Sequence, residues 1–129
     1  MKTVAICGSR RFKPGIRAFA NELKNGGVVV FEPFLHSGVD EWNKLSDDYK
    51  RFVALGLTLD HFYKIKMADV IFVYNQDGYA GVSTTLELGC AVALGKPVYA
   101  LSNKDPEMCR MVLVHGFIDN ARDFLEVLK

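Results

Sequence analysis

The chain has 129 residues, of which 50% are hydrophobic and 24% are charged. Domains of roughly 150 residues are typical, so we expect a single globular domain over residues 1–129 that is not disordered. The 16 Lys and Arg residues nearly balance the 15 Asp and Glu residues, and the formal net charge is +1. This balance gives no overall field that would attract a nucleic-acid polymer or an anionic membrane, so any affinity for phosphate must be local.

The three cysteines, Cys7, Cys90 and Cys109, are widely spaced and form no C-x-x-C pair. An odd number with this spacing encodes neither a disulfide framework nor a zinc knuckle, and it fits a reducing compartment. The first apolar run, residues 4–7, is too short for a signal peptide or a membrane span. We therefore expect a cytoplasmic protein with no membrane partner.

The opening residues predict a strand, a helix and a second strand. Residues 3–7 are a largely continuous apolar run and do not alternate, which is typical of a strand buried on both faces of a parallel sheet. A helix is expected over residues 14–25, because this segment begins with a proline and is followed by two glycines. The β-branched residues 28–31 predict the second strand.

A helical pattern follows Asp40, which can cap a helix over residues 41–55 that ends at Gly56. A further helix is expected over residues 58–67. The apolar positions of the first helix form an aromatic stripe: Trp42, Leu45, Tyr49 and Phe52. Such a stripe either covers the sheet within one chain, which is the more common case, or contacts a second subunit.

The clearest buried strand of the sequence covers residues 68–74. A polar, glycine-rich loop over residues 75–81 then leads to a helix that begins at Ser83 or Thr84 and ends at Gly95. The face of this helix that is expected to pack inward comprises Leu86, Cys90, Ala93 and Leu94.

Two more strands, residues 98–101 and 111–114, and a last helix are expected at the end of the chain. Asp119 can cap that helix. Its apolar face comprises Phe124, Leu125 and Leu128.

Strands that alternate with helices through short loops predict an α/β fold with right-handed crossovers. We expect a flavodoxin-like, Rossmann-like three-layer sandwich with a five-stranded parallel sheet in the order 2-1-3-4-5. Ligands of such sheets bind outside the carboxyl ends of the strands, where the strand order reverses. The loops over residues 8–13 and 75–83 should meet at that point.

The loop over residues 8–13 combines a glycine, a hydroxyl group and three cations ahead of a helix. Gly8 permits close approach of the backbone, and Ser9 and Arg10 supply donors, which together are the ingredients of a phosphate site. The alternative is a solvated basic turn in which Ser9 caps the chain locally.

Glu87 lies in the first turn of a helix that points toward the same region, where the helix end favours an ionised carboxylate. An ionised carboxylate can act as a nucleophile. However, Thr84-Thr85-Leu86-Glu87 is also a capping box, in which Glu87 would accept the backbone N–H of Thr84. The spacing alone favours the capping role.

Asp77 follows the buried strand and could bind sugar hydroxyls or supply a proton, or it could form an Asx turn in the loop. Tyr79 could stack on a base or cover the loop. The three histidines show no metal-ligand spacing, and the sequence contains no G-x-G-x-x-G motif. We therefore expect no metal and no cofactor.

Three segments carry a family resemblance: residues 65–73 (IKMADVIFV), residues 77–81 (DGYAG), and residues 87–98, which begin ELGCA and end GKPV. In this order they resemble the nucleoside 2-deoxyribosyltransferase superfamily. The start of the chain, residues 6–10 (ICGSR), looks especially like its nucleotide N-hydrolase branch. The resemblance implies a single nucleoside 2-deoxyribosyltransferase-like domain that acts as a homodimer on a small nucleoside or nucleotide.

In that family the glutamate of the Glu-Leu-Gly motif attacks the anomeric carbon of a nucleoside and releases the base. By resemblance this role falls on Glu87, with Asp77 as the group that assists the leaving base or as the ligand of the sugar hydroxyls. Gly8, Ser9 and Arg10 would hold a 5′-phosphate if the substrate is a nucleotide. The remaining substrate-binding residues that the resemblance implies are Asp69, Tyr79, Gly81 and His61.

The sequence departs from the family pattern at two positions. Ala5 stands where members commonly carry a tyrosine in the first strand, and His61 stands where they commonly carry an aspartate. A histidine can still serve as an acid or base near neutral pH. The alternatives are a nucleotide-binding or sensing module that has lost catalysis and, less favoured, an interaction domain without a small ligand.

Overall fold

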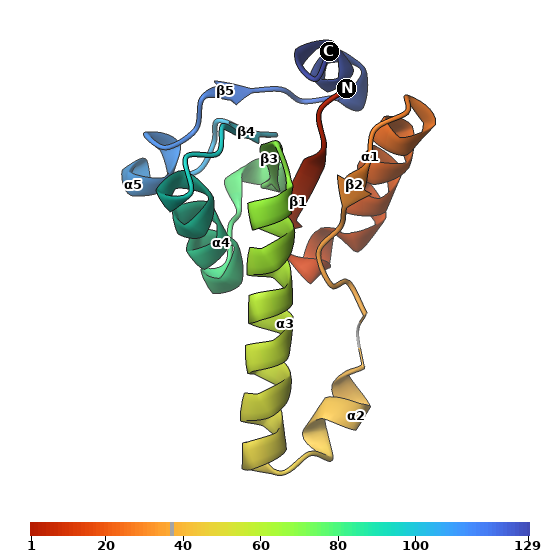
Figure 1. Ribbon diagram of the computed structural model, residues 1–129. Helices are drawn as coiled ribbons and strands as arrows, with labels where there is room; N and C mark the ends of the chain where they lie inside the picture. Colours follow the sequence, from red (N-terminus) through yellow and green to blue (C-terminus); the bar gives the residue numbers. More distant parts are fainter. Residues whose placement is uncertain (37) are drawn as a thin grey trace.

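The computed structural model describes residues 1–36 and 38–129, and it is built around a five-stranded sheet (Figure 1). The strand order is β2-β1-β3-β4-β5, and every neighbouring pair is parallel. The predicted α/β fold and its strand order 2-1-3-4-5 are therefore confirmed. The strands are β1 (Val4–Gly8), β2 (Val30–Phe31), β3 (Val70–Tyr74), β4 (Val98–Ala100) and β5 (Gly116–Phe117).

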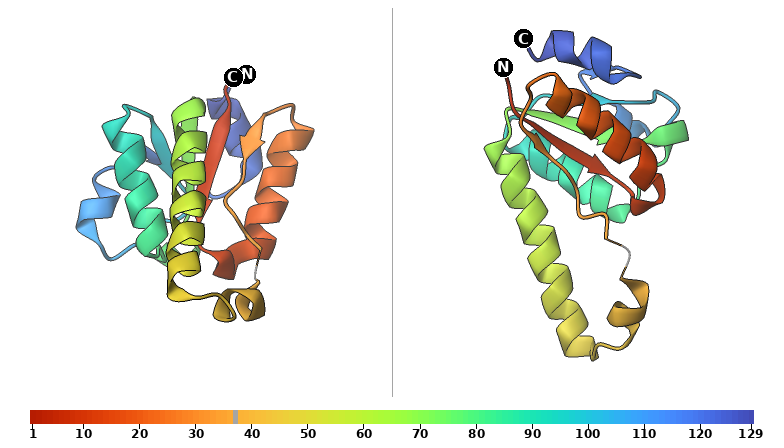
Figure 2. Two further views of the ribbon diagram at one scale, coloured as in Figure 1. Left: turned by 60° about the horizontal axis from the view of Figure 1, so that its bottom comes forward. Right: turned by 90° about the vertical axis from the view of Figure 1, so that its right-hand side faces the viewer.

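Helices cover both faces of this sheet. Helices α1 and α6 pack together on one face, and α3 packs against α4 on the other (Figures 1 and 2). The α-helices are α1 (Lys13–Asn25), α2 (Val39–Asn43), α3 (Asp47–Met67), α4 (Val82–Ala93), α5 (Met108–Met111) and α6 (Ala121–Val127), and two short 3-10 helices are η1 (Arg10–Phe12) and η2 (Gln76–Gly78).

Strand β1 contributes to two apolar cores because its side chains alternate between the faces of the sheet. Val4 and Ile6 pack under α1 and α6, whereas Ala5 and Cys7 face α3 and α4. All four side chains are buried, which explains the continuous apolar run in the sequence. Cys7 thereby lies beneath the two helices that form the wall of the candidate site.

The region between β2 and β3 differs from the prediction. Instead of helices over residues 41–55 and 58–67, the structure has a short α2 and a 21-residue α3 that continues through Gly56. Ser46 begins α3 by accepting a hydrogen bond from the backbone N–H of Tyr49, and two aspartates occupy the first turn. This cap breaks the chain after α2, whereas one glycine inside a long helix costs only about 0.5–1 kcal/mol.

The break separates the members of the predicted aromatic stripe. Trp42 and Leu45 belong to the α2 region, while Tyr49 and Phe52 lie on α3 and are 65% and 72% exposed. The interpretation of the stripe as a core face is therefore wrong. Helix α2 and the first half of α3 extend beyond the edge of the sheet (Figure 2).

The predicted strand over residues 111–114 is also wrong. That segment begins with the end of α5, and β5 follows it at Gly116. The pairing starts later because the backbone N–H of His115 donates to the carbonyl of Val98 and thereby sets the register of β5 beside β4. The last helix is capped by Asn120 in place of Asp119, and Phe124 is fully buried as expected.

Helix α4 is rotated relative to the prediction. Its buried residues are Thr84, Glu87, Leu88 and Ala91. Leu86 and Leu94, predicted to point inward, are exposed. The rotation occurs because Leu88 and Ala91 pack on the sheet, and it turns the polar side chain of Glu87 toward the interior.

Among residues 1–36 and 38–129, no helix combines the length and apolar composition that are needed to cross a bilayer.

Candidate active site

A cavity of about 830 Å³ opens beyond the carboxyl end of β1. Its wall includes Gly8, Ser9 and Arg10 from the loop after β1. Trp42 from α2 contributes to the opposite wall, together with side chains of α3 and α4. The position agrees with the expected ligand site at the reversal of strand order, between β1 and β3.

Glu87 on α4 faces this cavity and is nearly buried. One carboxylate oxygen, Oε2, lies 2.9 Å from Nε2 of His61 on α3. The residue that caps α4 is Gly81, with no side-chain cap, so the predicted capping box is not formed. The capping role favoured by the sequence spacing is therefore wrong, and the carboxylate is available to the cavity.

Cys7 lies behind this pair and makes it a cluster of three groups. Its Sγ atom is 3.5 Å from Nε2 of His61, and its side chain is fully buried. Burial, followed by the nearby carboxylate of Glu87, raises the pKa of the Cys7 thiol well above its ordinary value. The cysteine is accordingly a neutral thiol at neutral pH.

The loop after β1 approaches the cavity closely because it has a glycine at its start. A Cβ atom on Gly8 would lie 2.9 Å from Cδ1 of Ile16 and 3.1 Å from the carbonyl oxygen of Tyr74. Ser9 caps the short helix η1 by accepting the backbone N–H of Arg11. Arg10 donates to the carbonyl of His36 across the cavity rim, at 3.3 Å.

The second predicted loop contributes less than expected. Gly81 lines the cavity, but Asp77 and Tyr79 are not among the residues that line it. Tyr79 instead packs against the loop after β1, with the guanidinium of Arg11 over its ring, 3.6 Å from the centroid. Asp77 is exposed and has a left-handed backbone, with a φ of 57°.

Asp69, predicted to bind substrate, lies at the amino ends of the strands, opposite the cavity. It precedes β3, and its Oδ2 accepts hydrogen bonds from the backbone N–H and the hydroxyl of Thr3 at 2.8 and 3.0 Å. These hydrogen bonds lower the pKa of Asp69. Because the cavity opens at the carboxyl ends of the strands, the assignment of Asp69 to the site is wrong, and its role is to tie β1 to β3.

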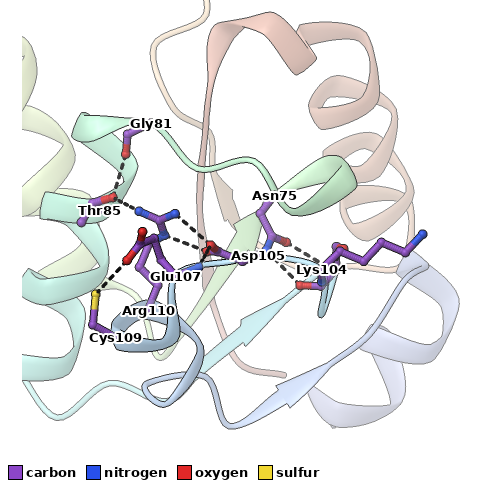
Figure 3. Close-up of polar contacts among 9 residues, drawn as sticks. Asn75, Gly81, Thr85, Lys104, Asp105, Glu107, Cys109 and Arg110 are labelled. Atoms are coloured by element: carbon purple, nitrogen blue, oxygen red, sulfur yellow. Dashed lines mark hydrogen bonds and ion pairs between the residues drawn. The ribbon is translucent and has the colours of Figure 1, made fainter.

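The first turn of α4 is held by a polar network that the sequence did not indicate (Figure 3). The guanidinium of Arg110 contacts both carboxylate oxygens of Asp105, at 2.7 and 2.8 Å, and donates to the hydroxyl of Thr85. The side chain of Asp105 is almost fully buried, and the hydrogen bonds from Arg110 lower its pKa. Because Thr85 is two residues before Glu87, this network orients the turn that carries the carboxylate.

Sequence reasoning also missed Cys7 and Trp42 as neighbours of the site. Cys7 was assessed only for disulfide and zinc-knuckle patterns. Trp42 was assigned to one long helix with Tyr49. A serine with aspartates immediately after it, at Ser46, was the signal that could have revealed the break and the extra wall of the cavity.

No protein-family model matches the chain, and no curated protein matches it. Solved structures do resemble it, and three examples match it over nearly the whole length. A 2-deoxyribosyltransferase from Bacillus psychrosaccharolyticus has a TM-score of 0.64 and 21% identity, with coverage of 95% of this chain and 90% of that one. A CMP N-glycosidase from Clostridium botulinum, BcmB, has a TM-score of 0.58 and 19% identity, with coverage of 98% and 97%.

The third structure is a conserved protein from Enterococcus faecalis V583, with a TM-score of 0.61, 13% identity and coverage of 98% and 96%. The chain therefore has the fold of the nucleoside 2-deoxyribosyltransferase-like proteins, as the sequence resemblance implied.

Proposed function

We propose that the protein cleaves or transfers the N-glycosidic bond of a nucleoside or nucleoside 5′-monophosphate, with Glu87 as the nucleophile. The observation that carries this proposal is the carboxylate of Glu87, which faces a cavity of about 830 Å³ and does not cap its own helix. The folds of a deoxyribosyltransferase and a CMP N-glycosidase support the same chemistry.

In the proposed reaction a carboxylate oxygen of Glu87 forms a bond to C1′ of the sugar. The bond between C1′ and the base nitrogen breaks, and its electron pair leaves with the base, through a transition state with oxocarbenium character. The imidazole of His61 is the adjacent acid-base group and supplies a proton to the departing base. Water or a second base then displaces Glu87 from C1′ with the same stereochemical inversion, so the sugar configuration is retained overall.

The loop after β1 is the proposed site for a 5′-phosphate. Gly8 and Ser9 line the cavity at the carboxyl end of β1, and the Arg10 guanidinium reaches its rim. Guanidinium groups bind phosphate through charge-assisted hydrogen bonds. Gly81 lines the cavity beside Glu87 and allows the sugar to approach the start of α4. Asp77 and Tyr79 lie outside the lining and have no part in the proposed reacting centre.

We also propose that the protein is a homodimer that uses α3. One face of this helix carries five exposed apolar side chains: Tyr49, Phe52, Leu55, Leu59 and Tyr63. They recur at intervals of three and four residues and so form one continuous stripe along the helix. A stripe of this kind on a helix that extends beyond the sheet suits a second copy packed against α3.

The test of the activity is release of free base from a panel of ribo- and deoxyribonucleosides and their 5′-monophosphates, followed by chromatography. We expect Glu87→Gln to reduce release at least about a thousandfold, because the amide is not a nucleophile. The matched control is Glu22→Gln, an exposed carboxylate on α1 outside the cavity, which should keep full activity.

Base release that survives in Glu87→Gln would remove Glu87 from the mechanism. Stabilisation of the fold by a nucleotide without any base release would instead identify a nucleotide-binding module, the alternative left open by Ala5 in the first strand. Addition of a free second base separates a transferase from a hydrolase, because only a transferase forms the new nucleoside.

A further inference from the structure

Three chemically different side chains converge behind the cavity from three separate elements. Cys7 comes from β1, His61 from α3 and Glu87 from α4. Each offers one ligand atom, and the three atoms all lie within 4.8 Å of one another. The measured separations are 2.9 Å from His61 Nε2 to Glu87 Oε2 and 3.5 Å from the same nitrogen to Cys7 Sγ.

These separations are close to the edges of a small metal-coordination polyhedron, the 3.5 Å edge within its range and the 2.9 Å edge shorter than it. Zinc binds sulfur at about 2.3 Å and nitrogen or oxygen at about 2.0–2.2 Å, so its tetrahedral ligands lie roughly 3.3–3.6 Å apart. The observed atoms need to move by only a few tenths of an ångström to about 1 Å to adopt this geometry. The elements that carry them are packed into one core, which presents the three ligands together before a metal arrives.

The polar atoms of the cluster are not satisfied within the protein. Glu87 Oε2 is buried and accepts no hydrogen bond from the described residues. It lies 2.9 Å from Nε2 of His61, which is close enough for an ion pair, but the two groups are not aligned as a hydrogen bond. His61 Nδ1 is also buried and unpaired within that part of the chain. A buried carboxylate oxygen that lacks an aligned donor is satisfied when a cation binds beside it.

We propose that Cys7, His61 and Glu87 form a binding site for a zinc ion, with the fourth coordination position open to the cavity. Glu87 and His61 line the cavity and Cys7 lies behind them, so an ion held by all three has one free side toward that space. A thiolate, an imidazole and a carboxylate form a ligand set that suits zinc better than magnesium or calcium, which prefer oxygen ligands. The thiol proton is released to solvent as the zinc–sulfur bond forms.

This site goes beyond the proposed glycosyl chemistry and does not depend on it. If both proposals are correct, zinc binding and base release cannot occur in one molecule at the same time, because a carboxylate oxygen of Glu87 that is bound to zinc cannot attack C1′. Zinc would then inhibit base release at one equivalent per chain, and a chelator would restore it.

The experiment uses Co²⁺ as a spectroscopic probe and Zn²⁺ as its competitor on the intact, metal-free protein. We expect one equivalent of Co²⁺ to produce a thiolate-to-cobalt charge-transfer band together with intense visible bands of a four-coordinate ion, and one equivalent of Zn²⁺ to abolish them. Cys7→Ser should remove the charge-transfer band. It should also weaken zinc binding by more than about 100-fold, since loss of even an indirect supporting group costs 10–100-fold.

The matched control is Cys109→Ser, which removes an exposed thiol outside the cluster and should leave the spectrum unchanged. His61→Gln and Glu87→Gln, checked for folding by circular dichroism, test the other two ligands and keep the proposal falsifiable if Cys7→Ser does not fold. The absence of a charge-transfer band, or a band that persists in the Cys7, His61 and Glu87 variants, would overturn the site. These metal-binding results do not decide whether the protein releases base, because base release is measured separately in the presence of a chelator.

Discussion

The imidazole Nε2 of His61 lies 2.9 Å from the carboxylate Oε2 of Glu87, although the two residues are carried by different helices. Both side chains are about nine-tenths buried and both line the same cavity. The contact joins α3 to α4 at the carboxyl end of the sheet and brings an acid-base group next to a carboxylate. The proposed chemistry and the proposed zinc site both follow from this relationship.

His61→Gln should slow the release of ordinary bases by about 100-fold, because a proton donor to the leaving group is lost. Nucleotides of 7-methylguanine carry a leaving group that is already positively charged and needs no proton. The release of 7-methylguanine should therefore fall by less than about tenfold, because this leaving group gains little from a general acid. The measurement is kcat for the two substrates. An equal loss for both would show that His61 positions Glu87 and does not protonate the base.

Arg10→Ala should raise KM for nucleoside 5′-monophosphates by about 10- to 100-fold and leave the parent nucleosides unchanged. A charge-assisted hydrogen bond contributes about 1.5–3 kcal/mol, which corresponds to this range. Arg17→Ala is the control, since Arg17 is an exposed cation on α1 outside the cavity lining. An effect on nucleosides as large as that on nucleotides would argue against a phosphate contact.

Asp105→Asn should lower the free energy of unfolding by about 2–3 kcal/mol at pH 7, because a buried carboxylate that pairs with Arg110 is lost. The folded pKa of Asp105 is lowered, so the ionised pair stabilises the protein above the unfolded pKa of about 3.9 and this contribution disappears as pH falls through the folded pKa. The difference between wild type and variant should therefore shrink below about pH 4.

Denaturant unfolding at several pH values measures this dependence. Asp48→Asn is the control, because the pair of Asp48 with Arg51 is exposed to solvent and should contribute less than about 1 kcal/mol. A constant difference between wild type and Asp105→Asn across the acid range would contradict the assignment of the lowered pKa.

Phe52→Glu should convert a dimer into a monomer, because it places a charge within the exposed apolar stripe on α3, at its most exposed member. Light scattering coupled to size-exclusion chromatography measures the mass. Val112→Glu introduces the same charge at an exposed apolar position next to α5 and should leave the mass unchanged. A wild-type protein that is monomeric at all concentrations would refute the dimer.

The strand order could be predicted because β1 and β3 are buried on both faces and β4 is nearly so, and all three appear as apolar runs in the sequence. The strand of residues 111–114 was misplaced because a short edge strand carries almost no pattern, and its register depends on the contact of His115 with Val98. The position of β5 is therefore set by tertiary hydrogen bonds and not by the local strand propensity of the sequence.

For the candidate site, the sequence indicated the loop with Gly8, Ser9 and Arg10 and the carboxylate of Glu87. It could not choose between capping and catalysis for Glu87, because the same spacing serves both. The rotation of α4, which depends on how Leu88 and Ala91 pack against the sheet, excluded the capping role.

The amino-acid sequence by itself determined the alternation of strands and helices, since burial on two faces or on one leaves a periodic pattern that can be read along the chain. Only the tertiary structure decided that Cys7, His61 and Glu87 share one cluster and that Asp69 lies at the other end of the sheet. The physical reason is that proximity between residues 54 and 26 positions apart arises from the packing of α3 and α4 on β1, and no local pattern records it.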